Sequence, residues 1–459
     1  MRRRTLLPAA AAAAVIGPAA ASAAKASGRS GEDGPVVEVP NGRLRGKAND
    51  GVLTFHNIPY ARAGRFQPPE PAARWSGVRD AVARGPICPQ GPGRLAFSIN
   101  DPPSSMSQSE DCLNLSITTP GVAGRRPVIV WIHGGAYMIG GGETDQGDAE
   151  KLAAEGGVVV VAVSYRLGLF GYLWQSDPGR RNLGLLDQLA ALRWVVANIE
   201  RFGGDPENIT LAGQSAGGHS IVGMLERWTG TRPVRRVVLQ SSPISRRIGP
   251  DDAKRVADAF HAALGRDAET AAVAQVLAAQ GRAAAQGPPG MPIGPVLGSG
   301  SMDRRGLDIM IGWARDDSST LIALRESVSK PGNWFGEAGS GPATAEYTRT
   351  VFSEPAEALA ASTPADAKTY LYRLDLRPEG SPFGACHCLD LPLLFGDEAS
   401  WRGSGMLGRE SWSTFESLGR RVRAAWAAFA TTGDPSAEGG WDWRAWSGGA
   451  AGAITHLNL

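Results

Sequence analysis

The sequence has no excess of charge of either sign. Its 47 lysine and arginine residues almost balance its 45 aspartate and glutamate residues, which leaves a formal net charge of +2 over 459 residues. A protein that binds nucleic acid normally presents a basic excess on one face. We therefore expect no nucleic-acid partner.

The sequence opens on an apolar run that is too short for a membrane span. The run is rich in alanine and broken by a proline, and it is shorter than a helix that crosses a bilayer core of about 30 Å. Three arginines precede it and Ala21-Ser22-Ala23 follows it, the pattern of an export signal cleaved after Ala23. Arg3-Arg4 fit twin-arginine export as well as the ordinary secretory route. We expect residues 1–23 to be a signal peptide, residues 24–35 to be a flexible mature N-terminus, and the protein to be secreted without stable membrane insertion.

Cysteine is scarce, with residues only at Cys88, Cys112, Cys386 and Cys388. An exported protein can carry a disulfide among so few cysteines. Cys386 and Cys388 flank His387, and a metal or redox site at this segment would occupy that histidine. Three adjacent residues are too cramped to supply one zinc tetrahedron. We therefore disfavour a metal site there and leave the role of Cys386 and Cys388 open.

Runs of β-branched and other apolar residues recur along the chain and predict buried strands. They lie at 128–133, 158–165, 209–212, 237–240, 307–312 and 369–374. Between the second and third runs, Leu189, Leu192 and Val196 fall at helical spacing. Strand, helix and strand in this order predict a mostly parallel central sheet flanked by helices, an α/β fold.

Two other regions have a different pattern. Residues 36–46 predict a hairpin that turns at Asn41-Gly42. Residues 251–286 are rich in alanine and predict two helices parted by Gly265. Because this stretch interrupts the strand series, we interpret about 251–301 as a helical cap insertion in a single domain that covers residues 36–459.

Ser215 stands in ITLAGQSAGG, where a buried strand meets a tight turn and the start of a helix. A serine between glycines also occurs in ordinary turns, so the context decides. In a strand-turn-helix elbow, side chains at Gly213 and Gly217 would collide with the neighbouring strand and helix. The serine would then stand exposed at a helix N-terminus, whose partial positive charge favours a developing oxyanion.

A serine nucleophile needs a base and an orienting carboxylate. His387 follows the last predicted strand, as the order Ser, acid, His requires. Asp316 and Asp317 follow the strand that ends near Gly312, although the pair could also be a surface turn. A second glycine-rich turn, in VWIHGGAYMIG, matches neither GxxxxGK nor GxGxxG and can aim backbone N–H groups at an oxyanion.

These segments resemble the type B carboxylesterases, the α/β-hydrolase family that includes cholinesterases and bacterial p-nitrobenzyl esterases. The resemblance rests on SEDCLNLSI at 109–117 and FGGDPENITLAGQSAGG at 202–218, which look like the two long signatures of the family. FHNIPYA, VSYRLGLFGYL and FATTGDP follow in the family's order, so that the resemblance covers about residues 36–446.

The resemblance implies a role for each candidate residue. Ser215 would be the nucleophile, His387 the general base and Asp317 the residue that orients the imidazole. The oxyanion donors would be the backbone N–H groups of Gly135, Ala136 and Ala216. The family also implies a disulfide between Cys88 and Cys112, a small-molecule ester as substrate, and neither a metal nor an organic cofactor.

The chain departs from the family in three places. The acid motif is Asp316-Asp317-Ser318 instead of Asp-Glu-Gly, Gln214 replaces a glutamate, and the loop from Cys88 to Cys112 has no tryptophan. Cholinesterases rest a quaternary ammonium on that aromatic face, so choline esters are disfavoured here. The short spans between the triad candidates imply a reduced cap.

We therefore expect a secreted serine carboxylesterase that hydrolyses small neutral carboxylic esters through an acyl-enzyme intermediate. An acyl-transfer or cyclising enzyme with the same triad is an alternative, since water and an alcohol attack the same acyl-serine. A second alternative is an inactive cholinesterase-like binding protein. The sequence leaves open the natural ester and the oligomeric state.

Overall fold

The structure is a computed structural model. It describes residues 34–49, 51–93, 95–99, 106–228, 232–298, 302–329, 341–437, 440–447 and 454–459. The predicted signal peptide, residues 1–23, and almost all of the predicted flexible segment, residues 24–35, lie outside the described residues. Asp33–Leu459 form one compact unit.

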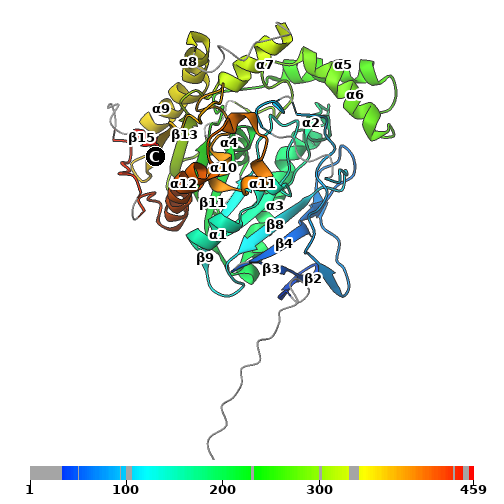
Figure 1. Cartoon of the computed structure of the whole chain (residues 1–459). Helices are drawn as coiled ribbons and strands as arrows, with labels where there is room; N and C mark the ends of the chain where they lie inside the picture. The colour runs from blue at the N-terminus through cyan, green and yellow to red at the C-terminus, as the bar shows by residue number, and fades with distance from the viewer. Residues whose placement is uncertain are drawn as a thin grey trace, which may run out of the picture. The chain divides into compact units, whose positions relative to one another are not determined.

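A ten-stranded sheet runs through this unit in the order β15-β14-β13-β12-β11-β9-β10-β8-β4-β3 (Figure 1). From β15 to β10 every neighbouring pair is parallel, whereas β8, β4 and β3 join antiparallel. Its strands are β3 Lys47–Asn49, β4 Val52–Pro59, β8 Asn114–Thr119, β9 Arg126–Ile132, β10 Val159–Val163, β11 Gly204–Gln214, β12 Val234–Gln240, β13 Asp308–Ala314, β14 Thr369–Leu374 and β15 Ile454–Leu457. The predicted, mostly parallel sheet is confirmed.

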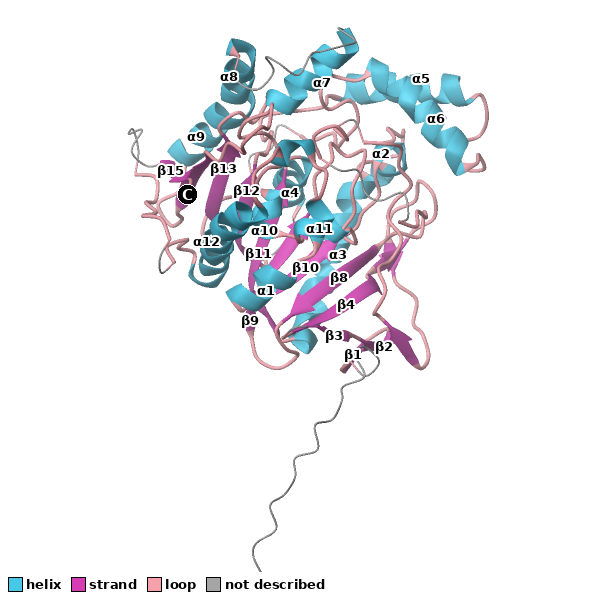
Figure 2. Cartoon of the chain, viewed as in Figure 1, coloured by secondary structure: helices cyan, strands magenta, loops and turns pink. Residues whose placement is uncertain are grey.

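The helices cover both faces of the sheet (Figure 2). They are α1 Glu150–Gly156, α2 Gly168–Tyr172, α3 Leu183–Asn198, α4 Ala216–Arg227, α5 Pro250–Leu264, α6 Val273–Ala283, α7 Ser319–Ser329, α8 Pro342–Thr348, α9 Glu354–Ala361, α10 Leu391–Leu394, α11 Glu398–Trp401 and α12 Trp412–Thr432. Short turns of helix join them: η1 Asp145–Gly147, η2 Pro178–Arg180, η3 Ile199–Phe202, η4 Ala284–Gln286, the π-turn η5 Arg349–Ser353 and η6 Gly405–Leu407.

Two smaller sheets complete the fold. One consists of β1 Val36–Val39, β2 Gly42–Arg45 and β7 Val78–Asp80, and the other of β5 Ala61–Arg62 and β6 Glu70–Pro71. β1 and β2 pair antiparallel with Val39 opposite Gly42, which confirms the predicted hairpin.

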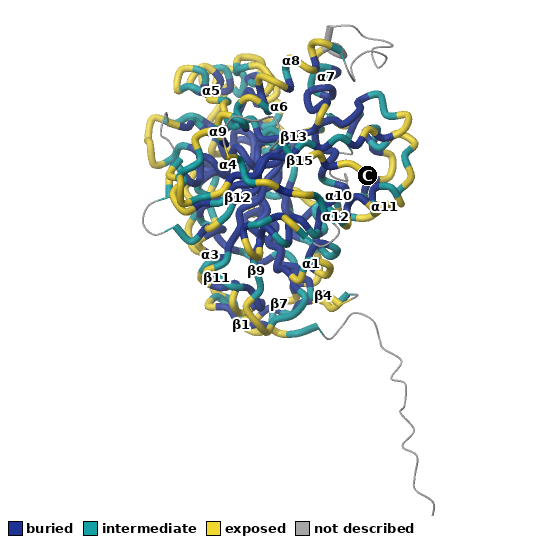
Figure 3. Tube along the Cα trace, turned by 90° about the vertical axis from the view of Figure 1, so that its left-hand side faces the viewer, coloured by how far each residue is buried: buried dark blue, intermediate teal, exposed yellow. Residues whose placement is uncertain are grey.

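The buried parts of the first two parallel strands, Val128–Ile132 of β9 and Val159–Val163 of β10, are apolar at every position because both faces of the sheet are covered (Figure 3). In β9, Val130 and Ile132 pack in the cluster that contains residues of α3 and α4, while Trp131 packs in the cluster that contains residues of α1 and α12. Alternation of side chains between the two faces therefore requires large hydrophobic residues throughout the strand. None of the helices in the described parts of the chain has the length and apolarity that crossing a bilayer requires.

Helices α5 and α6 are the two helices predicted between residues 251 and 286. Gly265 ends α5 in the left-handed conformation, with φ of 65°. Both views place α5 and α6 at the end of this unit opposite β1 (Figures 2 and 3). Each buries one face, for example Val256 and Phe260 of α5, so the pair is packed onto the body.

Strand β11 turns directly into α4 at Ser215, and two glycines permit the turn. A Cβ atom on Gly217 would lie 1.9 Å from the carbonyl oxygen of Ile132 in β9, and one on Gly213 would lie 2.7 Å from the backbone of Gly217. Real Cβ atoms do not approach backbone so closely. The predicted need for glycine at both positions is confirmed.

Gly217→Ala should therefore disrupt the turn. The clash is with backbone, which cannot rotate away, so we expect a loss of at least about 3 kcal/mol, the upper end of ordinary overpacking costs. Thermal unfolding followed by circular dichroism measures it.

Gly281→Ala is the matched control, because a Cβ on Gly281 of α6 would meet nothing within 4 Å. That variant should gain roughly 0.5–1 kcal/mol from the better helix propensity of alanine. Unchanged stability in the Gly217→Ala variant would show that the α4 turn is not held by this contact.

Candidate active site

Ser215 occupies a strained backbone position at the end of β11. Its φ of 54° and ψ of −122° are unusual for a residue with a side chain. The Ser215 N–H donates to the carbonyl oxygen of Gln240 at 2.8 Å, and its own carbonyl accepts from His219 N–H at 3.1 Å. Ser215 is partly exposed, whereas Gln214 and Ala216 on either side of it are buried. Such strain in a tightly bonded turn is common at functional sites.

Asp317 and His387 meet through a short hydrogen bond. Oδ1 of Asp317 lies 2.6 Å from Nδ1 of His387, and both side chains are buried. The other carboxylate oxygen accepts from the Ser241 hydroxyl at 2.6 Å and from the Ala314 N–H at 2.8 Å. The carboxylate is thus fully hydrogen-bonded, which fixes its direction.

Asp316 points elsewhere. Its Oδ2 accepts from the Ala385 N–H at 3.1 Å and lies 3.2 Å from Nε of Arg377. The structure therefore brings Asp317, and not Asp316, to the imidazole.

The other nitrogen of His387 lies beside Gln214. Nε2 of His387 is 3.2 Å from Nε2 of the Gln214 amide. Because Nδ1 carries the proton that Asp317 accepts, Nε2 is the acceptor of the neutral ring, and the Gln214 amide donates to it. In the described part of the chain, the Ser215 hydroxyl has no recorded hydrogen bond to His387. The atom that would receive the serine proton is occupied by Gln214.

The pKa of His387 is held well above its usual value. Burial lowers the pKa, but the Cys388 side chain and the Asp317 carboxylate outweigh burial by charge and by hydrogen bonds to the ring. Cys388 has a left-handed backbone, with φ of 71°, and Phe352 of η5 lies 5.6 Å from the imidazole between ring centres.

The glycine-rich turn after β9 approaches the serine closely. A Cβ on Gly134 would lie 3.2 Å from Cβ of Ser215. Gly135 and Ala136 have φ of 100° and 52°, and Ala216 is the first residue of α4. No acceptor within the described residues is recorded for the N–H groups of these three residues. They are candidate oxyanion donors: Gly135 and Ala136 follow Gly134 in the turn, and Ala216 directly follows Ser215.

Cys88 and Cys112 are buried thiols in contact with each other. Their mutual hydrogen bond raises the pKa of Cys112, as does burial. Sγ of Cys88 also accepts from the Leu167 N–H at 3.2 Å. The structure holds both as free cysteines, so the disulfide stays a prediction.

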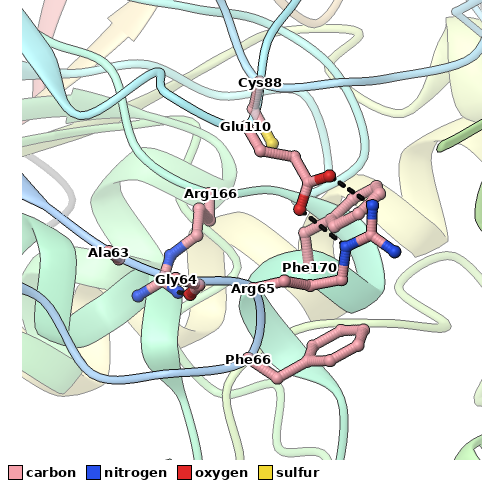
Figure 4. A pocket seen from close by; sticks show the side chains of 8 residues that line it. All are labelled: Ala63, Gly64, Arg65, Phe66, Cys88, Glu110, Arg166 and Phe170. Carbon is pink, nitrogen blue, oxygen red and sulfur yellow. Dashed lines mark hydrogen bonds and ion pairs between the residues drawn. The ribbon is translucent and has the colours of Figure 1, made fainter. Parts of the chain in front are cut away.

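A small pocket lies beside Cys88 and contains none of the triad candidates (Figure 4). It is lined by Ala63, Gly64, Arg65, Phe66, Cys88, Glu110, Arg166 and Phe170. Arg65 pairs with Glu110 across it and also donates to the carbonyl oxygen of Ala268, at 3.0 Å, in the connection between α5 and α6. Through Arg65 this pocket connects the segment around Glu110 with the chain between α5 and α6.

Sequence reasoning paired Asp317 with His387 but did not predict the other partners of these two residues. Gln214 was identified only as a departure from the family, and Ser241 and the Cys388 contact were not predicted. Ser241 directly follows β12, with φ of 45°, so its position at a strand end is the one signal that could have found it. No group of three or more metal-ligating side chains in the described ranges is arranged to hold an ion.

The fold and the site define a hydrolase of the α/β-hydrolase class, and comparisons give the family. The model of the carboxylesterase family matches residues 33–283. A protein described as a probable N-octanoylanthranilate hydrolase of Rhodococcus erythropolis is 38% identical over 422 residues, which cover 86% of this chain and 93% of that protein. The para-nitrobenzyl esterase of Bacillus subtilis (strain 168) is 34% identical over 453 residues, 88% of this chain and 91% of that protein.

Solved structures agree. A thermophilic para-nitrobenzyl esterase superposes with a TM-score of 0.77 at 31% identity, over 89% of this chain and 93% of that chain. The chain therefore belongs to the carboxylesterase family and is a carboxylic ester hydrolase with the α/β-hydrolase fold. The predicted family, fold class and ester hydrolysis are confirmed.

The two adjacent aspartates give a direct test of the acid. Asp317→Asn keeps the shape but favours the wrong imidazole tautomer, so turnover should fall by up to about 10⁴. Asp316→Asn is the matched control and should be far milder, because its carboxylate faces Arg377 and Ala385. Steady-state kinetics of both variants measure this. If the Asp316→Asn variant loses its activity while the Asp317→Asn variant keeps it, Asp316 is the acid of the triad.

The raised pKa of His387 predicts the acid limb of the pH profile. The base has to be neutral to accept a proton, so kcat/KM should rise with pH along a limb whose midpoint lies above about 6.5, the ordinary value for histidine. Residual activity of Asp317→Asn should show a lower midpoint, since the carboxylate that stabilises the imidazolium is gone. A wild-type midpoint clearly below the ordinary value would contradict the assignment of His387 as base.

Proposed function

We propose that the protein is an exported serine carboxylesterase that hydrolyses small neutral carboxylic esters through an acyl-enzyme intermediate. Ser215 is the nucleophile, His387 the general base and Asp317 the orienting acid. The N–H groups of Gly135, Ala136 and Ala216 receive the oxyanion. The observation that carries this proposal is the strained, partly exposed Ser215 beside a buried His387–Asp317 pair.

The reaction follows from these positions. Oγ of Ser215 attacks the ester carbonyl while its proton passes to Nε2 of His387, and the carbonyl electron pair moves onto the oxygen. The free N–H groups stabilise that charge, each donor being worth about 10²–10³ in turnover. Collapse expels the alcohol, which takes the proton from His387. Water then attacks the acyl-serine with the same base and releases the acid.

Gln214 has to release His387 before the first proton transfer. Its amide donates to the same Nε2 that accepts the serine proton. Exchange of one neutral hydrogen bond for another costs little, on the order of 0.5–1.5 kcal/mol. The Gln214 contact therefore permits catalysis.

The names of two relatives suggest aromatic substrates. The R. erythropolis relative is named for an N-acylated anthranilate and the B. subtilis relative for a nitrobenzyl ester. We propose to screen nitrophenyl and benzyl esters with acyl chains of increasing length. N-octanoylanthranilate, which is an amide, is tested beside them. Hydrolysis of the amide at a rate comparable with the esters would make amide cleavage the second function. An added alcohol that diverts the acyl group would reveal acyl transfer.

Ser215→Ala tests the nucleophile. Turnover should fall by roughly 10⁶ with the fold intact, as in other triad knockouts. A fluorophosphonate probe should label the wild-type protein and leave the variant unlabelled, and absence of labelling in the wild type would favour an inactive binding protein. Retention of more than about a hundredth of the activity would reject Ser215, because even loss of an oxyanion donor costs 10²–10³.

Export would expose Cys88 and Cys112 to oxidation. We propose that they form a disulfide in the secreted protein, which their contact in the fold permits, and that its removal costs about 2–4 kcal/mol. Mass spectrometry of unreduced peptides from culture supernatant tests both export and the bond. A protein that is retained in the cell, or secreted with both thiols free, would contradict this proposal.

A further inference from the structure

The proposed oxyanion turn is strained at two consecutive residues that are not glycine. Ala136 and Tyr137 have φ of 52° and 61°. A left-handed conformation costs roughly 1–2 kcal/mol at each residue with a Cβ atom. The turn holds this conformation only if its surroundings enforce it.

A hydrogen-bonded side-chain pair ties this turn to the helix of the nucleophile. The hydroxyl of Tyr137 lies 2.6 Å from Nδ1 of His219, the fourth residue of α4. Nε2 of His219 lies 3.0 Å from the carbonyl oxygen of Arg246. A carbonyl only accepts, so Nε2 carries the ring proton and Nδ1 accepts from Tyr137. The Ser220 hydroxyl donates to the Tyr137 oxygen at 3.3 Å.

Burial keeps the protonation of this pair constant. Tyr137, His219 and Ser220 are fully buried. Burial lowers the pKa of His219 to about 4 and raises the pKa of Tyr137. At neutral pH the Tyr137 hydroxyl therefore donates to Nδ1 of His219, and Nε2 of His219 donates to the carbonyl oxygen of Arg246.

Packing holds the Tyr137 ring independently of its hydroxyl. The ring meets Tyr172 edge-on, with 5.0 Å between ring centres, and a Cβ on Gly294 would lie 2.8 Å from it. The Tyr137 carbonyl also accepts from the Gly168 N–H. Removal of the hydroxyl alone therefore leaves the ring in place and removes the short bond to His219 together with the longer contact from Ser220.

We propose that Tyr137 and His219 are positioning residues that hold the two halves of the oxyanion site in register. Gly135 and Ala136 come from the turn after β9, and Ala216 comes from α4. The Tyr137–His219 bond is the shorter of two side-chain links from Tyr137 to α4, the other being the Ser220 contact, and it sets the separation of the N–H groups. This inference rests on the proposed function of Ser215 and of the three donors.

Tyr137→Phe is the primary test. Because the donors are displaced but not removed, kcat should fall about tenfold, less than the 10²–10³ for loss of a donor, with KM within twofold of the wild type. A trifluoromethyl ketone forms a hemiketal with the serine and places its oxyanion among the donors. Its affinity should fall by the same factor as kcat, whereas a purely structural role would leave both unchanged.

His219 provides the partner test. His219→Leu should lose most of what Tyr137→Phe loses, since Tyr137→Phe also removes the Ser220 contact. The double variant should lose no more than Tyr137→Phe, because both changes remove the Tyr137–His219 bond. His219→Asn keeps an acceptor near the place of Nδ1 and should recover most of kcat. Additive losses, or equal activity of His219→Leu and His219→Asn, would overturn the proposal.

Tyr60→Phe is the matched control. Tyr60 is buried and its hydroxyl donates to the Ser164 carbonyl at 2.7 Å, away from the proposed donors. The Tyr60→Phe variant should lose about as much stability as Tyr137→Phe but keep the kcat and the inhibitor affinity of the wild type. Full activity of Tyr137→Phe with an inactive Ser215→Ala would reject the positioning role alone, whereas an active Ser215→Ala would reject the proposed function itself.

Discussion

The backbone contact between β9 and α4 sets the geometry on which the rest of the site depends. Gly217 lies so close to the carbonyl oxygen of Ile132 that no Cβ fits between them. The helix can start there only if the chain turns sharply, and the residue in the turn takes the positive φ seen at Ser215. The strain at the serine is thus imposed by the packing of a helix against the central strand.

The same contact explains how residues far apart in sequence meet. β9, β11, β12 and β13 are parallel neighbours, so their carboxyl ends lie at one edge of the sheet. The glycine turn, Ser215, Ser241 and Asp317 each follow one of these strands, and His387 comes from the segment after β14. The parallel strands therefore determine where the site residues lie, and the loops that follow the strands carry their side chains.

The six central strands could be predicted because burial on both faces leaves mostly apolar, often β-branched residues. β8 could not, because its sequence NLSITT has polar side chains although the strand is buried throughout; Ser116, for instance, donates to the carbonyl of Gly142. β15 has four residues at the sheet edge, too few for a periodic signal. In the site, chain order and motif indicated Ser215 and His387, and the acid motif of the family indicated Asp317. The residues alone left Asp316 open, because the choice between the two aspartates depends on side-chain direction. The Gln214 and Ser241 contacts depend on tertiary packing in the same way.

Arg65 links segments that are distant in sequence. It pairs with Glu110 in the segment between Cys88 and Cys112, and it donates to the connection between α5 and α6. Hydrogen bonds to charged groups contribute about 1.5–3 kcal/mol each, so separation of the cap from the body has to break several strong contacts together. In hydrogen exchange, the amides of this connection should therefore open as one cooperative unit with the body. The α5–α6 pair is consequently tied to the body at its connection and cannot move away without loss of these bonds.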